Sequence, residues 1–236
     1  MSFQFKQFAV NDTRSAMKVS TDGVLVGAWA PISPAVRTIL DVGAGSGLVS
    51  LMMAQRCQQA AITAIEIDAG AAEDCAENFA ASPWSSRLSL VCKDVMNFAP
   101  ETEFDMIVSN PPFFSEDVKA PDQRRAVARH GETLSPLSLI ELADSLLAAD
   151  GLLAMITDVR NEAEIRFSAE LHHLNILEMT YMATRVGKPD KRILWLMGRR
   201  PGQCHKSQLF LRDADANWHP DYVKLVEPFY LRMPKP

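Results

Sequence analysis

The chain has 236 residues, of which 47% are hydrophobic and 22% are charged, and its formal net charge is −5 at pH 7. These values suit one compact domain that is long enough to bury a full α/β core. No run of about 18 apolar residues and no charged-then-apolar N-terminal segment is present, so we expect no membrane span, no secretory signal and a cytoplasmic location.

The four cysteines are far apart and include no Cys-x-x-Cys pair: they are Cys57, Cys75, Cys92 and Cys204. This spacing favours neither a disulfide framework nor a zinc site. We therefore expect reduced cysteines that pack in the protein, and no bound metal.

The first predicted helix lies within Lys18 to Trp29, a segment that joins capping residues to an apolar stretch. A helix that begins near Ser20 or Thr21 would point its free N–H groups at an anion, because the first turn of a helix has unpaired donors. An ordinary capped helix that packs through its apolar side chains explains the same residues.

Apolar segments typical of strands then alternate with segments of helical periodicity. The strand candidates are 38–42, 61–66, 88–92, 104–109, 151–157, 174–184 and 192–198, and the helix candidates are 47–57, 69–81, 135–149 and 161–172. This alternation predicts a mostly parallel, doubly wound sheet of seven strands with helices on both faces. The last two strands flank a basic turn and predict an antiparallel hairpin at one sheet edge.

We expect a single domain over residues 1–236. Residues 1–34 would form an N-terminal segment that faces the cofactor and substrate, 35–200 the core, and 201–236 a C-terminal extension.

A glycine-rich turn, Asp41-Val42-Gly43-Ala44-Gly45-Ser46-Gly47, follows the first core strand. Glycines at alternate positions let the backbone turn tightly and let a ligand approach the start of the next helix. A dinucleotide fingerprint would have its third glycine three residues after the second, where this chain has Leu48. The spacing therefore disfavours a nicotinamide-dependent oxidoreductase.

Acidic residues follow the next two predicted strands. Glu66 ends the second one, where a carboxylate can accept hydrogen bonds from both hydroxyls of a ribose. Asp68 is most simply interpreted as a helix cap. Asp94 follows the third strand, where a lone Asp is as often a cap as a ligand contact.

The connection 110–134 has about 25 residues and is too long for an ordinary strand-to-helix loop, which indicates a functional role. It begins with Asn110-Pro111-Pro112-Phe113-Phe114. The Asn110 side-chain oxygen and the Pro111 carbonyl can each accept one hydrogen of an amino group, and the prolines stiffen the loop. A rigid turn without chemistry is the alternative.

These motifs resemble known enzymes. The alternate glycines led by an acidic residue resemble motif I of class I S-adenosylmethionine-dependent methyltransferases, and Asn110 to Phe113 resembles the tetrad of those that methylate amino groups. With Lys18 to Trp29, Arg129-His130-Gly131 and Arg199-Arg200-Pro201, they resemble bacterial tRNA adenine-N6 methyltransferases that modify the adenine next to the anticodon of valine tRNA. The resemblance covers nearly the whole chain and implies a Rossmann-like fold.

The resemblance also implies residue roles. Asp94 would contact the adenine amino group of the cofactor, and the Val95 N–H would face a ring nitrogen. Phe113 would stack on the flipped substrate base. The catalytic residues would be Asn110, Pro111, Pro112 and Phe113, and the S-adenosylmethionine contacts Lys18, Thr21, Asp41, Gly43, Gly45, Gly47, Glu66, Asp94, Val95 and Asn110.

Charge is segregated along the chain despite its acidic total. Residues 60–117 hold eleven acidic and two basic residues, while 118–130 carries a net +3 and 185–206 a net +6. Clustered Lys and Arg bind phosphates, so these two basic runs predict a tRNA surface on one rim of the cleft; a solvated face is the alternative. The expected substrate contacts are Phe113, Phe114, Arg125, Arg129, His130, Lys188, Lys191 and Arg192.

Other classes share part of this pattern. Release-factor glutamine methyltransferases usually carry Tyr at the position of Phe113 and a helical domain before the glycine turn, for which 40 residues leave little room. Ribosomal RNA guanine-N2 methyltransferases keep Phe but are usually longer. A non-catalytic nucleic-acid-binding module would not need the tetrad. We therefore expect a monomeric enzyme that methylates the exocyclic amine of adenine in tRNA.

Overall fold

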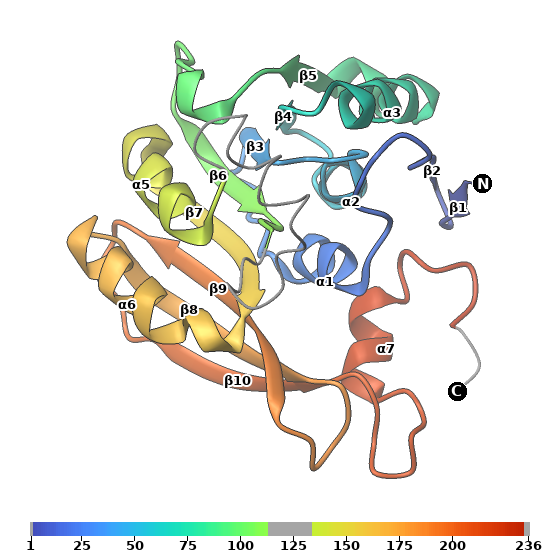
Figure 1. Ribbon diagram of the computed structural model, residues 1–236, viewed down its shortest axis with the longest axis vertical. Coiled ribbons are helices and arrows are strands. Elements are labelled where there is room, and N and C mark those ends of the chain that lie inside the picture. Colours follow the sequence, from blue (N-terminus) through green and yellow to red (C-terminus); the bar gives the residue numbers. More distant parts are fainter. Residues whose placement is uncertain (1, 113–133, 234–236) are drawn as a thin grey trace, which may run out of the picture.

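The protein is described by a computed structural model that covers residues 2–112 and 134–233. A mixed sheet runs through its centre and carries helices on both faces (Figure 1). Its strands are β3 (Thr38–Val42), β4 (Ala61–Glu66), β5 (Leu88–Cys92), β6 (Phe104–Ser109), β7 (Leu147–Asp158), β8 (Asn175–Ala183), β9 (Asp190–Gly198) and β10 (His205–Phe210). Their order across the sheet is β10-β8-β9-β7-β6-β3-β4-β5.

Strands β3 to β7 run parallel, so their carboxyl ends meet at one end of the sheet, which we call the carboxyl end. Strand β9 runs antiparallel to both β7 and β8. Arg192 near the start of β9 pairs in register with Asp158 at the end of β7, so β9 begins at the carboxyl end. Ligands of such sheets bind there.

The α/β class with a mostly parallel sheet and an antiparallel hairpin is confirmed, but two details of the prediction were wrong. The described part of the chain forms eight strands in this sheet, because β10 pairs in parallel with β8. The β8–β9 hairpin is therefore not at the edge. Strand β10 has a mostly exposed, polar sequence in which only Leu209 is buried, so it lacks the apolar pattern that marks a strand.

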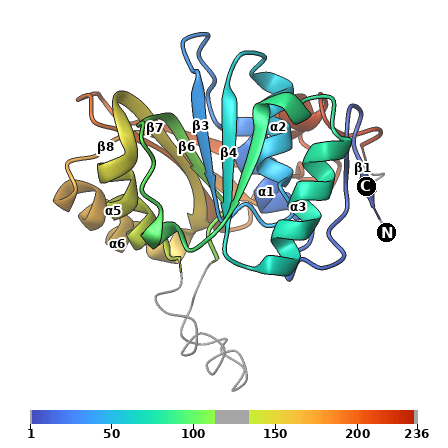
Figure 2. The ribbon, with the colours of Figure 1, turned by 90° about the horizontal axis from the view of Figure 1, so that it is seen from above.

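Helices cover the two faces in two groups (Figures 1 and 2). Helices α1 (Thr21–Trp29), α2 (Leu48–Arg56), α3 (Ala69–Ala81) and α7 (Pro220–Val226) lie on one face, and α5 (Pro136–Leu146) and α6 (Glu162–Leu171) on the other. Alternate strand residues enter the two cores: Ile39 packs on the α2 side and Leu40 on the α5 side. Short 3-10 turns occur at Ser85–Arg87, Val95–Asn97 and Val159–Asn161.

The two ends of the described chain lie side by side (Figure 1). Strands β1 (Phe3–Gln4) and β2 (Ala9–Val10) form a separate small sheet. The ring of Phe5 stacks on Tyr230 at 5.8 Å between centroids, and the Lys6 ammonium pairs with Glu227 at 2.7 Å. The C-terminal extension thus packs on the N-terminal segment and adds β10 to the sheet.

The surface and the cysteines complete this description. Cys57 and Cys75 are buried as predicted, whereas Cys92 is exposed, because it ends β5 at the edge of the sheet; all four cysteines are free.

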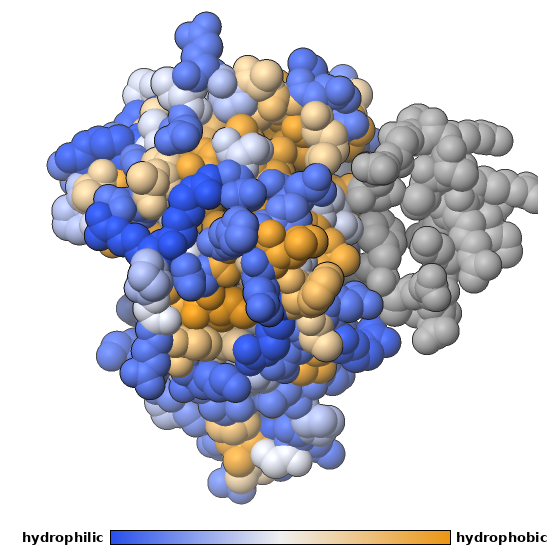
Figure 3. Space-filling view, turned by 90° about the vertical axis from the view of Figure 1, so that its left-hand side faces the viewer, coloured by the Kyte–Doolittle hydropathy of each residue, from blue (hydrophilic) through white to orange (hydrophobic). Residues whose placement is uncertain are grey.

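Apolar side chains reach the surface on the face of α5 and α6, where Phe167 and Leu171 are exposed (Figure 3). No helix among the described residues is long and apolar enough to cross a bilayer.

Candidate active site

A cleft of about 240 Å³ opens at the carboxyl end of the sheet. The N-terminal segment, the glycine turn, the ends of β4 and β5, and the residues after β6 form its wall, which comprises Ser15, Ala16, Met17, Gly43, Gly45, Ile65, Glu66, Ile67, Asp68, Ala71, Lys93, Asp94, Val95, Asn110, Pro112 and Leu134. A smaller hollow beside the start of α1 shares Met17, Gly43, Gly45 and Asn110 with it. The two spaces therefore adjoin.

The glycine turn has the conformation that its spacing predicts. Gly43, Gly45 and Gly47 have φ of 69°, 56° and 82°, which only glycine adopts without strain. A Cβ on Gly47 would lie 2.6 Å from a ring carbon of Phe79, so this glycine lets α2 pack against α3. A Cβ on Gly45 would meet nothing within 4 Å, which leaves the backbone open on the cleft side.

The Asp41 side chain holds the first turn of α2 in place through hydrogen bonds. Its Oδ2 accepts hydrogen bonds from the Ser50 N–H at 2.9 Å and the Ser50 hydroxyl at 2.7 Å. Burial raises the pKa of Asp41 to about 7, Ser50 opposes that shift, and the charge of Glu66 adds to it. The carboxyl group lines the hollow beside α1.

Glu66 is held from two sides. Its Oε2 accepts from the Gly45 N–H at 2.8 Å, and its Oε1 accepts from the Asp68 N–H at 2.9 Å. A carboxylate offers about four lone-pair sites, so each oxygen can accept one more hydrogen bond. With 9% of its surface exposed, Glu66 faces the cleft in a fixed orientation.

The other two acids act as caps. Asp68 caps α3 by accepting from the Ala71 N–H at 2.8 Å, as predicted. Asp94 caps the 3-10 turn Val95–Asn97 by accepting from the Met96 N–H at 3.0 Å, and it also lines the cleft beside Val95. The two interpretations of Asp94 are therefore compatible.

Asn110 follows the last residue of β6 and lines both the cleft and the hollow. Its Oδ1 is buried and has no hydrogen-bond partner among the residues that the structure describes. A buried unpaired acceptor costs about 1–3 kcal/mol, so this oxygen suits a donor from a bound molecule. Pro111 is buried and Pro112 lines the cleft. The predicted contacts Phe113, Phe114, Arg125, Arg129 and His130 lie outside the described residues.

The start of α1 lies where the sequence predicted it, at Ser20 and Thr21. Ser20 is the N-cap and accepts from the Gly23 N–H at 3.2 Å, and it lines the hollow. Thr21 is the first helical residue and does not line it. The Lys18 ammonium donates to the carbonyls of Ser15, at 2.9 Å, and of Asp12, so its charge closes a backbone loop at the edge of the hollow.

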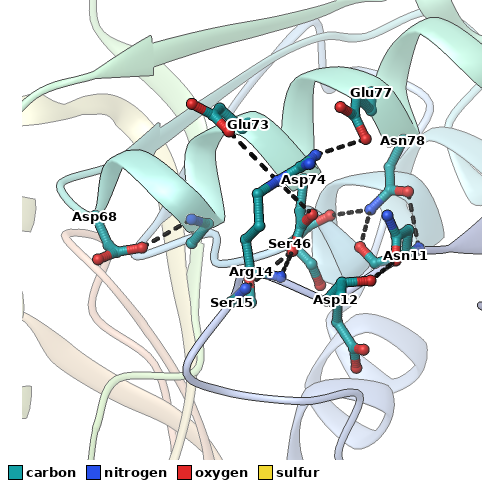
Figure 4. A network of polar contacts seen from close by, with 12 residues as sticks. Asn11, Asp12, Arg14, Ser15, Ser46, Asp68, Glu73, Asp74, Glu77 and Asn78 are labelled. Carbon is teal, nitrogen blue, oxygen red and sulfur yellow. Dashed lines mark hydrogen bonds and ion pairs between the residues drawn. The ribbon is translucent and has the colours of Figure 1, made fainter. Parts of the chain in front are cut away.

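A polar network beside the cleft was missed by the sequence analysis (Figure 4). Asp74 and Asn78 lie on one face of α3 and are both buried. Asp74 accepts from the N–H groups of Arg14 and Ser15, and Asn78 bonds the backbone of Asn11 in both directions. The available signal was the i, i+4 spacing of two polar residues on a helix otherwise rich in alanine.

The basic run 185–206 is divided by the fold. Lys188 and Lys191 are exposed in and after the β8–β9 turn, at the carboxyl end. Arg199 and Arg200 follow β9 at the other end, where they pair with Asp144 and with Asp150. Strand β9 has nine residues, so eight residue steps of about 3.4 Å separate its two ends by about 27 Å. The expectation that the whole run reaches one rim was therefore wrong; the run 118–130 lies outside the described residues.

Arg192, which was predicted to contact phosphates, is paired with two acids of the protein. Its guanidinium pairs with Asp22 of α1 at 2.9 Å and with Asp158 of β7 at 3.2 Å. The side chain is 24% exposed. Arg192 thus connects the start of α1 to the sheet at the carboxyl end.

A family model described as "Methyltransferase small domain" matches residues 29–181. This chain belongs to that family. The methyltransferase is 40% identical to a protein of Aeromonas hydrophila over 232 residues and 41% identical to one of Phocaeicola vulgatus over 231 residues, with 98% of each chain covered in both cases. Both relatives are named tRNA1(Val) (adenine(37)-N6)-methyltransferase.

Solved structures share the fold of this methyltransferase. A predicted O-methyltransferase of Agrobacterium tumefaciens superposes with a TM-score of 0.68 at 21% identity, over 88% of this chain and 96% of that one. A glycopeptide N-methyltransferase complexed with S-adenosylmethionine gives a TM-score of 0.53 at 13% identity, over 78% and 100%. The chain is a Rossmann-like, S-adenosylmethionine-dependent methyltransferase, as its motifs predicted.

Proposed function

We propose that this methyltransferase transfers a methyl group from S-adenosylmethionine to N6 of adenine 37 in tRNA1(Val), the activity in the names of its relatives. The observation that carries the proposal is the buried Asn110 Oδ1, which lacks a partner among the described residues and lies where the cleft meets the hollow. A hydrogen of the substrate amine would supply the hydrogen bond that this oxygen lacks. The carboxyl ends of four parallel strands surround that point.

The residues of the cleft suit the parts of the cofactor. Glu66 would accept from the ribose hydroxyls, and Asp94 with the Val95 N–H would contact the adenine edge. Ile67 is apolar yet 56% exposed, so a purine ring in the cleft would cover it. Gly45 leaves room for close approach of the ligand.

The hollow beside α1 suits the charged tail of the cofactor. The Asp41 carboxyl group and the capped start of α1 line or adjoin it, and they would face the amino and carboxylate groups of the methionine part. Lys18 would stabilise the loop around this hollow. Thr21 would contribute its N–H as the first helical residue, and Gly43 and Gly47 the shape of the turn.

The chemistry follows from the electronic state of the adenine amine. Its lone pair is delocalised into the ring, so the amine is a poor nucleophile. The Asn110 side-chain oxygen and the Pro111 carbonyl would each accept one amine hydrogen and turn the lone pair toward the methyl group. Bound S-adenosylmethionine supplies that methyl on a sulfonium. The amine nitrogen would gain the bond to the methyl carbon that the sulfur gives up, and solvent would take the proton that the nitrogen then releases.

Positive charge develops on the nitrogen during this transfer. Fixed carbonyl dipoles therefore stabilise the transition state more than the ground state. Pro112 would hold the loop rigid, and Phe113 would stack on the flipped base. This assignment gives the Asn-Pro-Pro-Phe segment a catalytic role in the proposal.

The substrate surface is part of the same proposal. Lys188 and Lys191 are exposed at the carboxyl end and would bind phosphates of the tRNA, together with Phe114, Arg125, Arg129 and His130. The enzyme would act in the cytoplasm as a monomer and without a metal. Sedimentation equilibrium tests the monomeric state, and retention of activity in a chelator tests the absence of a metal.

One experiment tests the proposed function. The enzyme is incubated with methyl-labelled S-adenosylmethionine and separate pools of tRNA, ribosomal RNA and release factor, and each product is digested and analysed. Label in N6-methyladenosine from the tRNA pool is expected. Label in N2-methylguanosine from ribosomal RNA, or in glutamine from release factor, would contradict the proposal.

A further inference from the structure

Ser15 stands out among the residues that line the cleft. It is 2% exposed, and its hydroxyl has no hydrogen-bond partner among the residues described. Burying a hydroxyl without a partner costs about 1–3 kcal/mol. Ser15 lines the cleft together with Glu66 and Asp68, which makes a bound molecule the natural partner of this hydroxyl.

The backbone of Ser15 is fixed by a buried acid (Figure 4). Asp74 on α3 is 0% exposed, and its Oδ2 accepts from the N–H groups of Arg14 at 2.7 Å and Ser15 at 2.9 Å. Its Oδ1 pairs with the Arg14 Nε at 3.0 Å. The two backbone donors on Oδ2 set the direction in which the Ser15 side chain leaves the backbone.

The segment 11–18, which we call the N-terminal strap, is tied down on both sides of Ser15. Asn78 accepts from the Asn11 N–H at 2.8 Å and donates to the Asn11 carbonyl at 2.7 Å. The same amide donates to the Ser46 carbonyl of the glycine turn at 2.9 Å. On the other side, the Lys18 ammonium bonds the Ser15 carbonyl at 2.9 Å. The strap is therefore anchored to α3 and to the glycine turn.

The place of Ser15 in the cleft indicates which part of a ligand it meets. It lines the main cleft with Glu66, Asp68 and Asp94, and it does not line the hollow beside α1. In the proposed placement of the cofactor, the main cleft holds the adenosine half. The methionine half lies in the hollow, beyond Ser15.

We propose that Ser15 is a further cofactor-binding residue, whose hydroxyl hydrogen-bonds to the adenosine half of S-adenosylmethionine, and that Asp74 is the positioning residue that presents it. The inference rests on the proposed placement of the cofactor in this cleft. It assigns a binding role to the strap, in addition to its role as the connection between β2 and α1.

The test is Ser15→Ala, measured by calorimetric titration and thermal unfolding. The dissociation constant for S-adenosylmethionine should rise about 3- to 10-fold, because the variant makes one hydrogen bond fewer to the ligand. The dissociation constant for 5′-methylthioadenosine, which lacks the amino acid part, should rise by the same factor. The melting temperature without ligand should stay the same or increase, because an unpaired buried hydroxyl has been removed.

Ser82→Ala is the matched control. Ser82 is also buried, at the end of α3, but its hydroxyl donates to the Phe79 carbonyl at 2.9 Å, and it does not line the cleft. This variant should melt at a lower temperature and bind S-adenosylmethionine normally. A lower melting temperature with unchanged binding in Ser15→Ala would overturn the proposal, and so would a weakening confined to S-adenosylmethionine.

Asp74→Asn tests the positioning role. It should raise KM for S-adenosylmethionine and leave kcat at saturating cofactor unchanged, and it should add little to Ser15→Ala in the double variant. A drop in kcat at saturation would contradict it. Glu66→Ala distinguishes a failure of this inference from a failure of the proposed cofactor site. Normal binding of S-adenosylmethionine by Glu66→Ala would contradict the placement of the cofactor in the cleft. Weak binding by Glu66→Ala together with normal binding by Ser15→Ala would overturn only the role of Ser15.

Discussion

The cleft and the basic run 185–206 were both inferred from short stretches of sequence, but the fold brings the cleft residues together and separates the basic residues. The cleft residues are dispersed from Ser15 to Leu134, and most of them converge because they lie at or after the end of a parallel strand. The basic residues are neighbours in sequence, and β9 carries them to opposite ends of the sheet. Position relative to a strand end therefore predicts proximity better than position along the chain.

Hydrogen bonding separates the two regions as well. In the cleft and the adjoining hollow, Glu66 and Asp41 are fixed by backbone and side-chain donors, and Asn110 keeps one buried acceptor without a partner in the described chain. In the basic run, Arg192, Arg199 and Arg200 are paired with acids of the protein itself. The cleft is preorganised for a ligand, whereas much of the positive charge of the run is neutralised internally.

The largest effect should come from Asn110→Ala. Turnover should fall about 10²- to 10³-fold, because the side-chain oxygen acts chiefly in the transition state. The dissociation constant for S-adenosylmethionine should change less than about 2-fold, since the other residues that hold the cofactor remain. Single-turnover kinetics and calorimetry measure the two quantities. Asn110→Asp keeps an acceptor and should retain more turnover; a binding defect with normal turnover would show that Asn110 is structural.

Glu66→Ala should raise the dissociation constant for S-adenosylmethionine about 10- to 100-fold, because it removes charge-assisted hydrogen bonds to the ribose. The hydrogen bond that anchors the Gly45 N–H disappears too. Glu66→Gln is the matched control, because its amide oxygen can still accept, and it should have a smaller effect. The affinities of a ribose-containing ligand and of its 2′-deoxy analogue are measured by titration. Glu66→Ala should bind the two with the same affinity.

Asp41, which lines the hollow beside the cleft, gives the site a pH signature. Its folded pKa of about 7 lies above the ordinary value of 3.8, so the folded chain holds the proton that the unfolded chain releases. Stability should therefore fall as pH rises from about 4 to 7, by about 2 kcal/mol between pH 5 and 7. Urea unfolding at both pH values measures this. In Asp41→Asn that part of the pH dependence should vanish; an identical slope in both proteins would disprove it.

Lys188→Ala with Lys191→Ala should weaken tRNA binding about 3- to 10-fold and lower the log–log salt slope by about 0.7 to 0.9 for each phosphate that is no longer neutralised. Arg199→Ala with Arg200→Ala removes the same charge at the opposite end of β9 and should leave affinity and slope unchanged. Filter binding at several salt concentrations measures both. Equal effects of the two double variants would mean that the fold does not divide the run functionally.

Arg192→Ala should have the smallest effect on RNA. The substitution leaves Asp22 and Asp158 without this cation, so the melting temperature should fall by a few degrees. The salt slope for tRNA should remain that of the unchanged enzyme. A flatter slope with an unchanged melting temperature would restore Arg192 to the phosphate surface.

The sequence predicted what local rules decide. The ends of the first four core strands, the positive-φ glycines and the cap at Asp68 follow from residue types and periodicity, and the structure agrees with them. Strand β7 begins four residues earlier than predicted. Strand β10 was not predicted, because a single buried side chain gives no alternation of apolar and polar residues. Asp74 and Asn78 escaped because their partners lie about 60 residues away, in the N-terminal strap, and no local signal specifies such a pairing. The ion pairs of Arg192 were not predicted, because its two acids come from two other elements.

The most direct test of the account is methylation of two tRNA1(Val) transcripts that differ only at position 37, where one has adenine and the other guanine. With labelled S-adenosylmethionine, the first transcript should gain one methyl group, recovered as N6-methyladenosine, and the second should gain none. Asn110→Ala should lower the rate of this methylation about 10²- to 10³-fold while still binding the cofactor. Methylation of the guanine transcript at the same rate, or undiminished methylation by Asn110→Ala, would contradict the central claim that Asn110 presents the amine of adenine 37 to the methyl group.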